Sequence, residues 1–154
     1  MAGSHIAIPT ILKIGSGTLG NVGKYLQSSG FKKAVVFFGN GLVEMFGKTV
    51  MDSLSEADIE VLSYCELDTT DIKDIIDLAF TIDAKTQVIL GIGGGKVIDA
   101  GKYAAYLRKL PFISMPTSAS SDGFSSASAS LLVNGKRTSV PARMHMESWW
   151  IRMY

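Results

Sequence analysis

Several features are scarce or absent in this 154-residue sequence, and each absence excludes a class of protein. The single cysteine, Cys65, excludes an internal disulfide framework and fits a reducing compartment, so we expect a cytoplasmic protein. No apolar run approaches the roughly 18 residues of a membrane span, and no charged leader precedes an apolar stretch. We therefore expect neither a membrane partner nor a signal peptide. Only 19% of the residues are charged and 47% are hydrophobic, which excludes a disordered chain.

A strong charge of either sign is also missing. Fifteen Lys and Arg against 14 Asp and Glu give a formal net charge of +1, so we expect no nucleic-acid partner. The charges are nevertheless uneven, because ten of the acids lie between Asp52 and Asp83. A solvated acidic helix face explains that cluster, and the alternative is that the second half of the chain binds an anion. The two histidines, His5 and His145, lack partners at metal-ligand spacing, so we expect no metal site in this chain.

What is present is an alternation of strand-like and helix-like segments. Ala34–Phe38 is a continuous apolar run typical of a buried parallel strand. Asp71–Ile82 has the apolar stripe of an amphipathic helix, which Thr70 is expected to cap. The predicted strands are Thr10–Ile14, Ala34–Phe38, Ile59–Tyr64, Val88–Leu90 and Phe112–Met115, and the predicted helices are Thr18–Ser29, Leu42–Leu54, Asp71–Ile82 and Lys96–Leu107. This order predicts an α/β fold, a Rossmann-like doubly wound parallel sheet with helices on both faces.

The pattern changes after this alternation. Asn134-Gly135 between Ala129–Val133 and Lys136–Val140 predicts a C-terminal β-hairpin with a type I′ turn. Residues 1–5 resemble an expression-vector remnant, and residues 144–154 share no pattern with what precedes them. We therefore expect a dinucleotide-binding domain over residues 6–143, followed by an unrelated tail.

Two glycine clusters compete for a phosphate-binding role. Gly15-Ser-Gly17-Thr-Leu-Gly20 matches G-x-G-x-x-G, but the next strand ends in Phe38-Gly39-Asn40-Gly41 without the acid that would hold a ribose. The second cluster, Gly91-Ile-Gly93-Gly94-Gly95-Lys96, lets the backbone approach a ligand closely at a helix N-terminus. Val97 follows it where a Walker A loop has Ser or Thr. The second cluster is therefore the predicted dinucleotide site, and the first is predicted to be a plain turn.

A serine-rich segment follows the last predicted strand of the alternation. Its small hydroxyl side chains can donate to phosphate or ribose oxygens at the carboxyl end of that strand. Asp122 is the lone acid there, and it is either an Asx-turn before Gly123 or a ligand-contacting group. Cys65 is interpreted as a small core residue.

Together these residues resemble a known family. The run Gly93-Gly94-Gly95-Lys96-Val-Ile-Asp99-x-x-Lys102 is similar to a motif of the superfamily of iron-containing alcohol dehydrogenases, glycerol dehydrogenases and dehydroquinate synthases. The runs Pro116-Thr117-x-x-Ser120-x-Asp122-Gly123 and Gly135-Lys136-Arg137 resemble those of its sn-glycerol-1-phosphate dehydrogenase branch. The resemblance covers roughly residues 6–143, which corresponds to the N-terminal nucleotide-binding domain.

The resemblance implies NAD or NADP as cofactor and dihydroxyacetone phosphate and sn-glycerol 1-phosphate, small phosphorylated polyols, as substrates. It implies Asp122 as a substrate-binding residue. The implied cofactor-binding residues are Gly93, Gly94, Gly95, Lys96, Val97, Ile98, Asp99, Thr117, Ser120 and Ser126.

The family continues into an all-helical domain that holds a divalent metal, usually Zn²⁺, through one Asp and two His. The sequence stops resembling the family before that domain, so we expect no catalytic residue in this chain and no activity from it alone. The alternatives are a relative of glycerol dehydrogenase or dehydroquinate synthase, and a non-catalytic nucleotide-binding module. Because an uncovered apolar surface drives association, we also expect a homo-oligomer.

Overall fold

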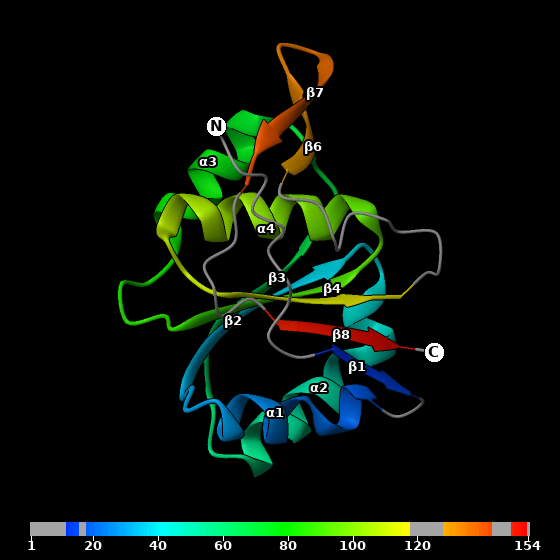
Figure 1. Cartoon of the computed structure of the whole chain (residues 1–154), viewed down its shortest axis with the longest axis vertical. Helices are drawn as coiled ribbons and strands as arrows, with labels where there is room; N and C mark the ends of the chain where they lie inside the picture. The colour runs from blue at the N-terminus through cyan, green and yellow to red at the C-terminus, as the bar shows by residue number, and fades with distance from the viewer. Residues whose placement is uncertain (1–11, 16–17, 118–127, 143–148, 154) are drawn as a thin grey trace, which may run out of the picture.

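The structure, a computed structural model, describes residues 12–15, 18–117, 128–142 and 149–153 and is built on one six-stranded sheet (Figure 1). The strand order is β1-β8-β5-β4-β2-β3, and every neighbouring pair is parallel. The strands are β1 (Leu12–Gly15), β2 (Lys33–Gly39), β3 (Glu60–Leu67), β4 (Val88–Gly93), β5 (Phe112–Pro116) and β8 (Trp149–Met153). The predicted doubly wound parallel sheet is thus confirmed.

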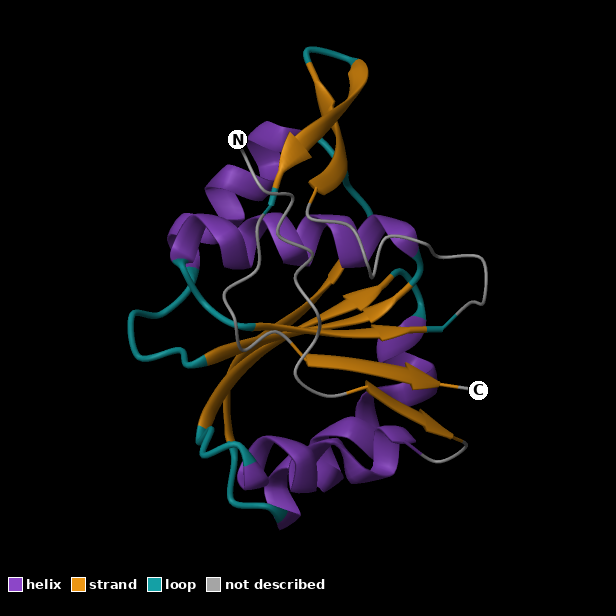
Figure 2. Cartoon of the chain, in the orientation of Figure 1, coloured by secondary structure: helices purple, strands orange, loops and turns teal. Residues whose placement is uncertain are grey.

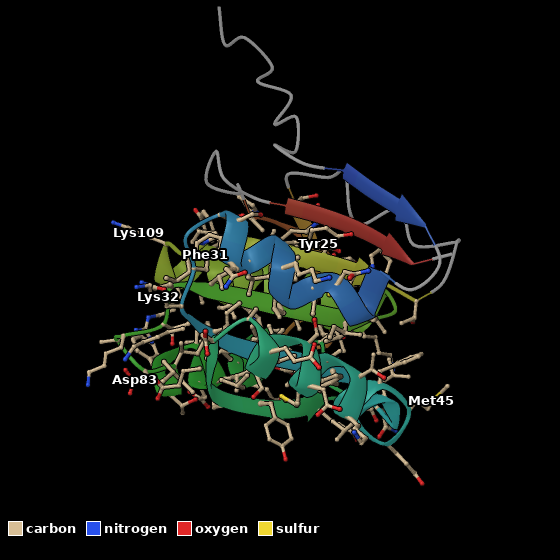
Figure 3. All side chains as sticks on the ribbon, turned by 90° about the horizontal axis from the view of Figure 1, so that it is seen from below. Tyr25, Phe31, Lys32, Met45, Asp83 and Lys109 are labelled. Atoms are coloured by element: carbon tan, nitrogen blue, oxygen red, sulfur yellow. The ribbon has the colours of Figure 1, made fainter. Side chains whose placement is uncertain are left out.

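Helices cover both faces of the sheet (Figure 2). On one face lie α1 (Val22–Ser28), preceded by the 3-10 turn η1 (Thr18–Asn21), and α2 (Leu42–Glu56). Figure 3 views this face from below, with Tyr25 on α1 and Met45 on α2 at its surface. On the other face lie α3 (Ile72–Thr81) and α4 (Gly95–Arg108), with the hairpin of β6 (Ser128–Val133) and β7 (Lys136–Pro141) packed beyond them.

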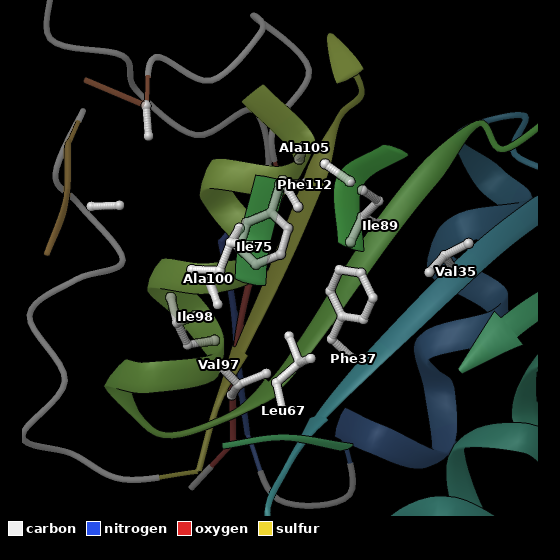
Figure 4. Close-up of a cluster of buried hydrophobic side chains, with 14 of the residues drawn as sticks. Val35, Phe37, Leu67, Ile75, Ile89, Val97, Ile98, Ala100, Ala105 and Phe112 are labelled. Atoms are coloured by element: carbon white, nitrogen blue, oxygen red, sulfur yellow. The ribbon is translucent and has the colours of Figure 1, made fainter. Parts of the chain in front are cut away.

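The core is divided into two apolar clusters by the sheet, because side chains alternate between its faces. Val36 and Phe38 of β2 belong to the cluster under α1 and α2. Val35 and Phe37 of the same strand belong to the cluster under α3 and α4, which Figure 4 shows. Both faces of β2 are therefore buried, which is why its sequence is a continuous apolar run.

The predicted hairpin is confirmed. Asn134 and Gly135 both have positive φ, 51° and 77°, as a type I′ turn requires. Strands β6 and β7 pair antiparallel from Val133↔Lys136 outward. No helix in the described part of the chain is both long enough and apolar enough to span a bilayer.

Two local predictions were wrong. The predicted helix Thr18–Ser29 divides into η1 and the seven-residue α1. The cap of α3 is Asp71, whose carboxylate accepts the Lys73 N–H at 2.9 Å, whereas Thr70 is buried. An acceptor at the N-cap needs extended backbone geometry, which Asp71 has, and its negative charge also suits the helix dipole.

Part of the predicted tail of residues 144–154 lies in the sheet. Its residues 149–153 form β8 inside the sheet, paired with β1 through Leu12↔Trp150 and with β5 through Ile113↔Trp149. Its Trp-Trp-Ile sequence has high strand propensity. A parallel strand is not joined to its neighbour by a tight turn, so the local sequence contained no turn signal for this pairing.

Candidate functional site

The chain moves along the sheet in opposite directions from β2 and from β4, and the switch point between these two strands locates the candidate site. The chain leaves β2 through α2 toward β3, whereas it leaves β4 through α4 toward β5 on the other side. The two helices lie on opposite faces of the sheet (Figure 1). In open α/β sheets, ligands bind beyond the carboxyl ends of the strands at such a switch point. The residues at those two ends are Gly39 and Gly93.

The turn from β4 into α4 depends on Gly93. Its φ of 148° is rarely adopted by residues with a side chain. A Cβ at this position would also lie 2.6 Å from Val97 Cγ1 and 3.2 Å from Gly39 Cα. The ends of β2 and β4 therefore approach each other closely at two glycines, and Gly39 is a candidate site residue that the sequence analysis did not single out.

The next two glycines face space instead of protein. Among the described residues, no neighbouring atom lies within 4 Å of the Cβ position built on Gly94 or on Gly95. The first hydrogen bond of the 14-residue α4 runs from the Ile98 N–H to the Gly94 carbonyl at 3.2 Å. The N–H groups of Gly95, Lys96 and Val97 therefore have no acceptor within the helix. Open space beside amides that lack helical acceptors fits the pyrophosphate of a dinucleotide at a helix N-terminus.

Close packing of α4 on the sheet sets the position of this turn. A Cβ on Gly91 of β4 would lie 2.6 Å from the Phe112 ring, and one on Gly101 of α4 would lie 2.7 Å from it. Both glycines therefore make room for Phe112 between the helix and the strand. Gly101 lay outside the predicted site, since its role depends on a residue of another element.

Thr117 and Lys96 flank the turn. The Thr117 N–H donates to the Gly93 carbonyl at 2.9 Å, which ties the end of β5 to the turn. Lys96 Nζ lies 3.7 Å from Asp68 Oδ1, just after β3, and both side chains are largely exposed. By contrast, the predicted site residues Val97 and Ile98 have buried side chains in the core. They can serve a ligand only through their backbone.

Asp99 of α4 contacts the hairpin and a neighbouring lysine. Its carboxylate accepts the Ser130 N–H of the hairpin, and its Oδ1 lies 4.0 Å from Lys102 Nζ. Burial raises the pKa of Asp99, while the positive charges of Lys102 and Arg137 and the Ser130 hydrogen bond oppose that rise. Burial lowers the pKa of Lys102, and Asp99 opposes that shift.

The first glycine cluster is arranged differently. It follows β1 at the edge of the sheet, far from the switch point in strand order. The Gly23 N–H in the first turn of α1 donates to the buried Ser53 Oγ of α2 at 2.9 Å. One N–H group at the N-terminus of α1 is therefore already bonded to a side chain of the protein.

Ser120, Asp122 and Ser126 lie outside the described residues, as does Gly17. The described residues contain no group of three or more His, Cys, Asp or Glu side chains that could hold a metal ion. They do not provide a metal site, and no chemical step through a metal is assigned to them.

Comparisons with known proteins agree with this architecture. The family model described as iron-containing alcohol dehydrogenase matches residues 13–146. The glycerol-1-phosphate dehydrogenase (NAD(P)+) of Methanothrix thermoacetophila is 34% identical over 143 residues, covering 91% of this chain and 40% of the relative. That of Thermoplasma volcanium is 40% identical over 111 residues, covering 71% and 31%.

Among solved structures, the glycerol dehydrogenase of Schizosaccharomyces pombe superposes with a TM-score of 0.82 and 26% identity. The superposition covers 94% of this chain and 37% of that structure. The chain thus spans well under half the length of the relatives that it matches.

Proposed function

The chain belongs to the iron-containing alcohol dehydrogenase family, and on that premise we propose that the β4–α4 turn binds NAD or NADP for hydride transfer with a small alcohol. The observation that carries the proposal is the open space beside Gly94 and Gly95, next to three helix N–H groups without helical acceptors. When bound, the dinucleotide supplies or accepts the hydride. The residues of this chain bind and orient it.

Each part of the turn has a distinct binding role in this proposal. The amides of Gly95, Lys96 and Val97 donate to the pyrophosphate oxygens, and the dipole of α4 favours their negative charge. Lys96 adds a mobile positive charge, because its exposed ion pair with Asp68 is easily exchanged for a phosphate. Because neither Gly39 nor Gly93 has a side chain, the ligand can cross from the end of β4 toward the end of β2.

We propose sn-glycerol 1-phosphate and dihydroxyacetone phosphate as the substrate pair. The support is the 34% and 40% identity to proteins named glycerol-1-phosphate dehydrogenase. In this proposal Asp122 contacts the substrate, and Thr117, Ser120 and Ser126 contact the cofactor. A divalent metal, which we propose to be Zn²⁺, requires ligands other than the described residues. Glycerol dehydrogenase activity is the second candidate, favoured by the likeness to the Schizosaccharomyces pombe enzyme.

A pair of matched substitutions tests the dinucleotide site. Gly94 and Gly20 both precede or open a helical segment, neither has a positive φ, and a Cβ on either meets no described atom within 4 Å. Gly94→Val and Gly20→Val should therefore both fold with melting temperatures near that of the unmodified chain. Only Gly94→Val places methyl groups where the pyrophosphate would lie.

The measurement is the Kd of NADH and of NADPH by fluorescence titration of the 154-residue chain. We expect Gly94→Val to raise the Kd at least about tenfold, equivalent to about 1.4 kcal/mol, and Gly20→Val to leave it within about threefold. Equal losses in the two variants, or the larger loss in Gly20→Val, would refute the assignment of the site.

A further inference from the structure

The end of β2 lies between two elements that begin at the switch point. A Cβ on Gly39 would lie 3.2 Å from Leu42 Cδ1, on the first residue of α2, and 3.7 Å from Gly93 Cα, at the start of the β4–α4 turn. The helices α2 and α4 lie on opposite faces of the sheet (Figure 1). The N-terminus of α2 is therefore a second helix N-terminus next to the proposed dinucleotide site.

A carboxylate from β3 is bonded to this second helix N-terminus. The Val43 N–H in the first turn of the 15-residue α2 donates to Glu66 Oε1 at 3.1 Å. The N-cap residue, Gly41, has no side chain that could accept a hydrogen bond there. Glu66 thus caps α2 from a neighbouring strand, and its negative charge suits the positive end of the helix dipole.

Glu66 also supplies an acid at a place where β2 has none. In dinucleotide-binding α/β folds, an acidic side chain near the phosphate turn accepts a hydrogen bond from a ribose 2′-OH. Strand β2 ends in Gly39, whereas Glu66 of β3 is paired in register with Phe38, one position before that end. Because neighbouring strands are about 4.8 Å apart, β3 lies two spacings, or about 10 Å, from β4.

The proposed substrate site sets the direction of the dinucleotide. Asp122, which we propose contacts the substrate, follows β5 in the chain, and β5 lies on one side of β4. The nicotinamide exchanges the hydride with the substrate, so it belongs on that side. The adenosine half then extends to the other side of β4, over the end of β2 and toward β3. Its ribose, which carries the 2′-phosphate in NADP, comes to lie beside Glu66.

NAD and NADP interact differently with a carboxylate at this place. A carboxylate has two oxygens with room for several donors, so Glu66 can accept from a ribose hydroxyl while it accepts from the Val43 N–H. A 2′-phosphate replaces that hydroxyl with about two negative charges, which the carboxylate repels. The other charged groups at this edge are Glu44 in the first turn of α2 and the ion pair of Lys96 with Asp68.

We propose that Glu66 makes this chain prefer NAD to NADP, because it accepts a hydrogen bond from the adenosine ribose and repels a 2′-phosphate. This proposal rests on the proposed function, since it presumes a dinucleotide at the start of α4. It adds the choice between two cofactors, which the name glycerol-1-phosphate dehydrogenase (NAD(P)+) of the relatives leaves open.

The test is the ratio of the Kd of NADPH to the Kd of NADH in the unmodified chain and in two matched variants. Glu66→Gln removes the charge and keeps an oxygen that can accept from the Val43 N–H. Glu60→Gln makes the same change at the first residue of β3, at the opposite end of the strand, where Glu60 Oε2 lies 3.5 Å from Lys33 Nζ. Both glutamates are exposed, so both variants should melt within about 2 °C of the unmodified chain.

The unmodified chain should bind NADH about tenfold more tightly than NADPH at low salt. Glu66→Gln should reduce this preference to about threefold or less, chiefly by tightening the binding of NADPH, while Glu60→Gln should keep it. Because salt screens the repulsion, the preference of the unmodified chain should shrink at high salt, and that of Glu66→Gln should change little. The ratio for adenosine 2′,5′-bisphosphate and AMP, which contain only the adenosine half, should shift in the same direction.

A third variant separates Glu66 from the other acid at this edge. Asp68 Oδ1 lies 3.7 Å from Lys96 Nζ, at the start of α4. Asp68→Asn releases Lys96 for the pyrophosphate, which both cofactors contain, so NADH and NADPH should gain affinity equally. Loss of the preference in Asp68→Asn but not in Glu66→Gln would overturn the role of Glu66.

The remaining outcomes separate this proposal from the proposed function. Equal binding of NADH and NADPH by the unmodified chain, or an unchanged preference in Glu66→Gln, would overturn the role of Glu66 and leave the dinucleotide site in place. An equal fall of the preference in Glu60→Gln would also overturn it, because the effect would then be one of overall charge. A chain that binds neither cofactor would overturn both proposals.

Discussion

The two glycine-bearing turns of this chain, after β1 and after β4, each contain a glycine that faces open space, and they differ at the helices that follow them. At the β1 turn, the Gly23 N–H of α1 is taken by Ser53 Oγ, and a Cβ on Gly23 would lie 1.9 Å from the Ser53 carbonyl oxygen. At the β4 turn, Gly94 and Gly95 face open space, and the first amides of α4 have no helical acceptors. The helix after the first turn packs closely against α2, whereas the second turn is the one that we propose binds a ligand.

This difference shows why glycine spacing alone is a weak guide. The β1 turn has the G-x-G-x-x-G pattern that is associated with dinucleotides, yet it lies at the sheet edge. The β4 turn lacks that pattern but lies at the switch point of the strand order. Three variants test this comparison, and the largest effect on stability is expected at Gly23 of α1.

Gly23→Ala should be the most destabilising of the three. Its Cβ would overlap the backbone of α2 at Ser53 and touch the Ala57 side chain, so α1 would have to move. Overpacking against backbone predicts a loss of about 3 kcal/mol in the free energy of unfolding. Urea denaturation measures it, with Gly20→Ala as the control because a Cβ there meets no described atom within 4 Å. Similar stability of the two variants would show that α1 and α2 are not packed as described.

Ser53→Ala should have a smaller effect on the same turn. It removes the acceptor of a buried N–H and leaves that donor unsatisfied, which costs about 1–3 kcal/mol of stability. Because the affected helix is not the one proposed to bind the ligand, the Kd of NADH should stay within about threefold of that of the unmodified chain. A loss of NADH affinity without a loss of stability would place the ligand at α1 and reverse the comparison.

Lys96→Met should have the smallest effect of the three variants on stability. The ion pair with Asp68 is exposed, so its loss should alter the free energy of unfolding by less than about 0.5 kcal/mol. The affinity for NADH should fall by about twofold to fivefold at low salt, and by less at high salt because screening weakens the attraction. Titrations at two salt concentrations measure this. A loss that does not change with salt would mean that Lys96 acts through packing and not through its charge.

Local patterns predicted most of the elements of the fold. The apolar run Ala34–Phe38 and the amphipathic stripe of residues 71–82 mark β2 and α3, because burial of one or both faces determines which residues each element can carry. Strand β8 and the strand order could not be read in this way. Both depend on parallel pairing between segments that are distant in sequence, and such pairing leaves no turn signal.

The candidate site stays a prediction, and its residues differ in how much local signal they carry in the sequence. The three consecutive glycines indicated the β4 turn, because few other functions need that much backbone access. Gly39 and Gly101 gave no such signal, since each is required by a residue of another element, Gly93 in one case and Phe112 in the other. The contacts of Asp99 with the hairpin were hidden for the same reason, because its partner Ser130 lies 31 positions further along the chain.

The most direct test of the binding turn is an NMR titration of the ¹⁵N-labelled 154-residue chain with NADH, following the backbone amides. The amides proposed to donate to the pyrophosphate, those of Gly95, Lys96 and Val97, should show the largest chemical-shift changes, with a smaller change at Thr117. The amides of Gly20 and Gly23 should move little. Large changes at Gly20 and Gly23, with the first turn of α4 unaffected, would contradict the assignment of the dinucleotide to the β4 turn.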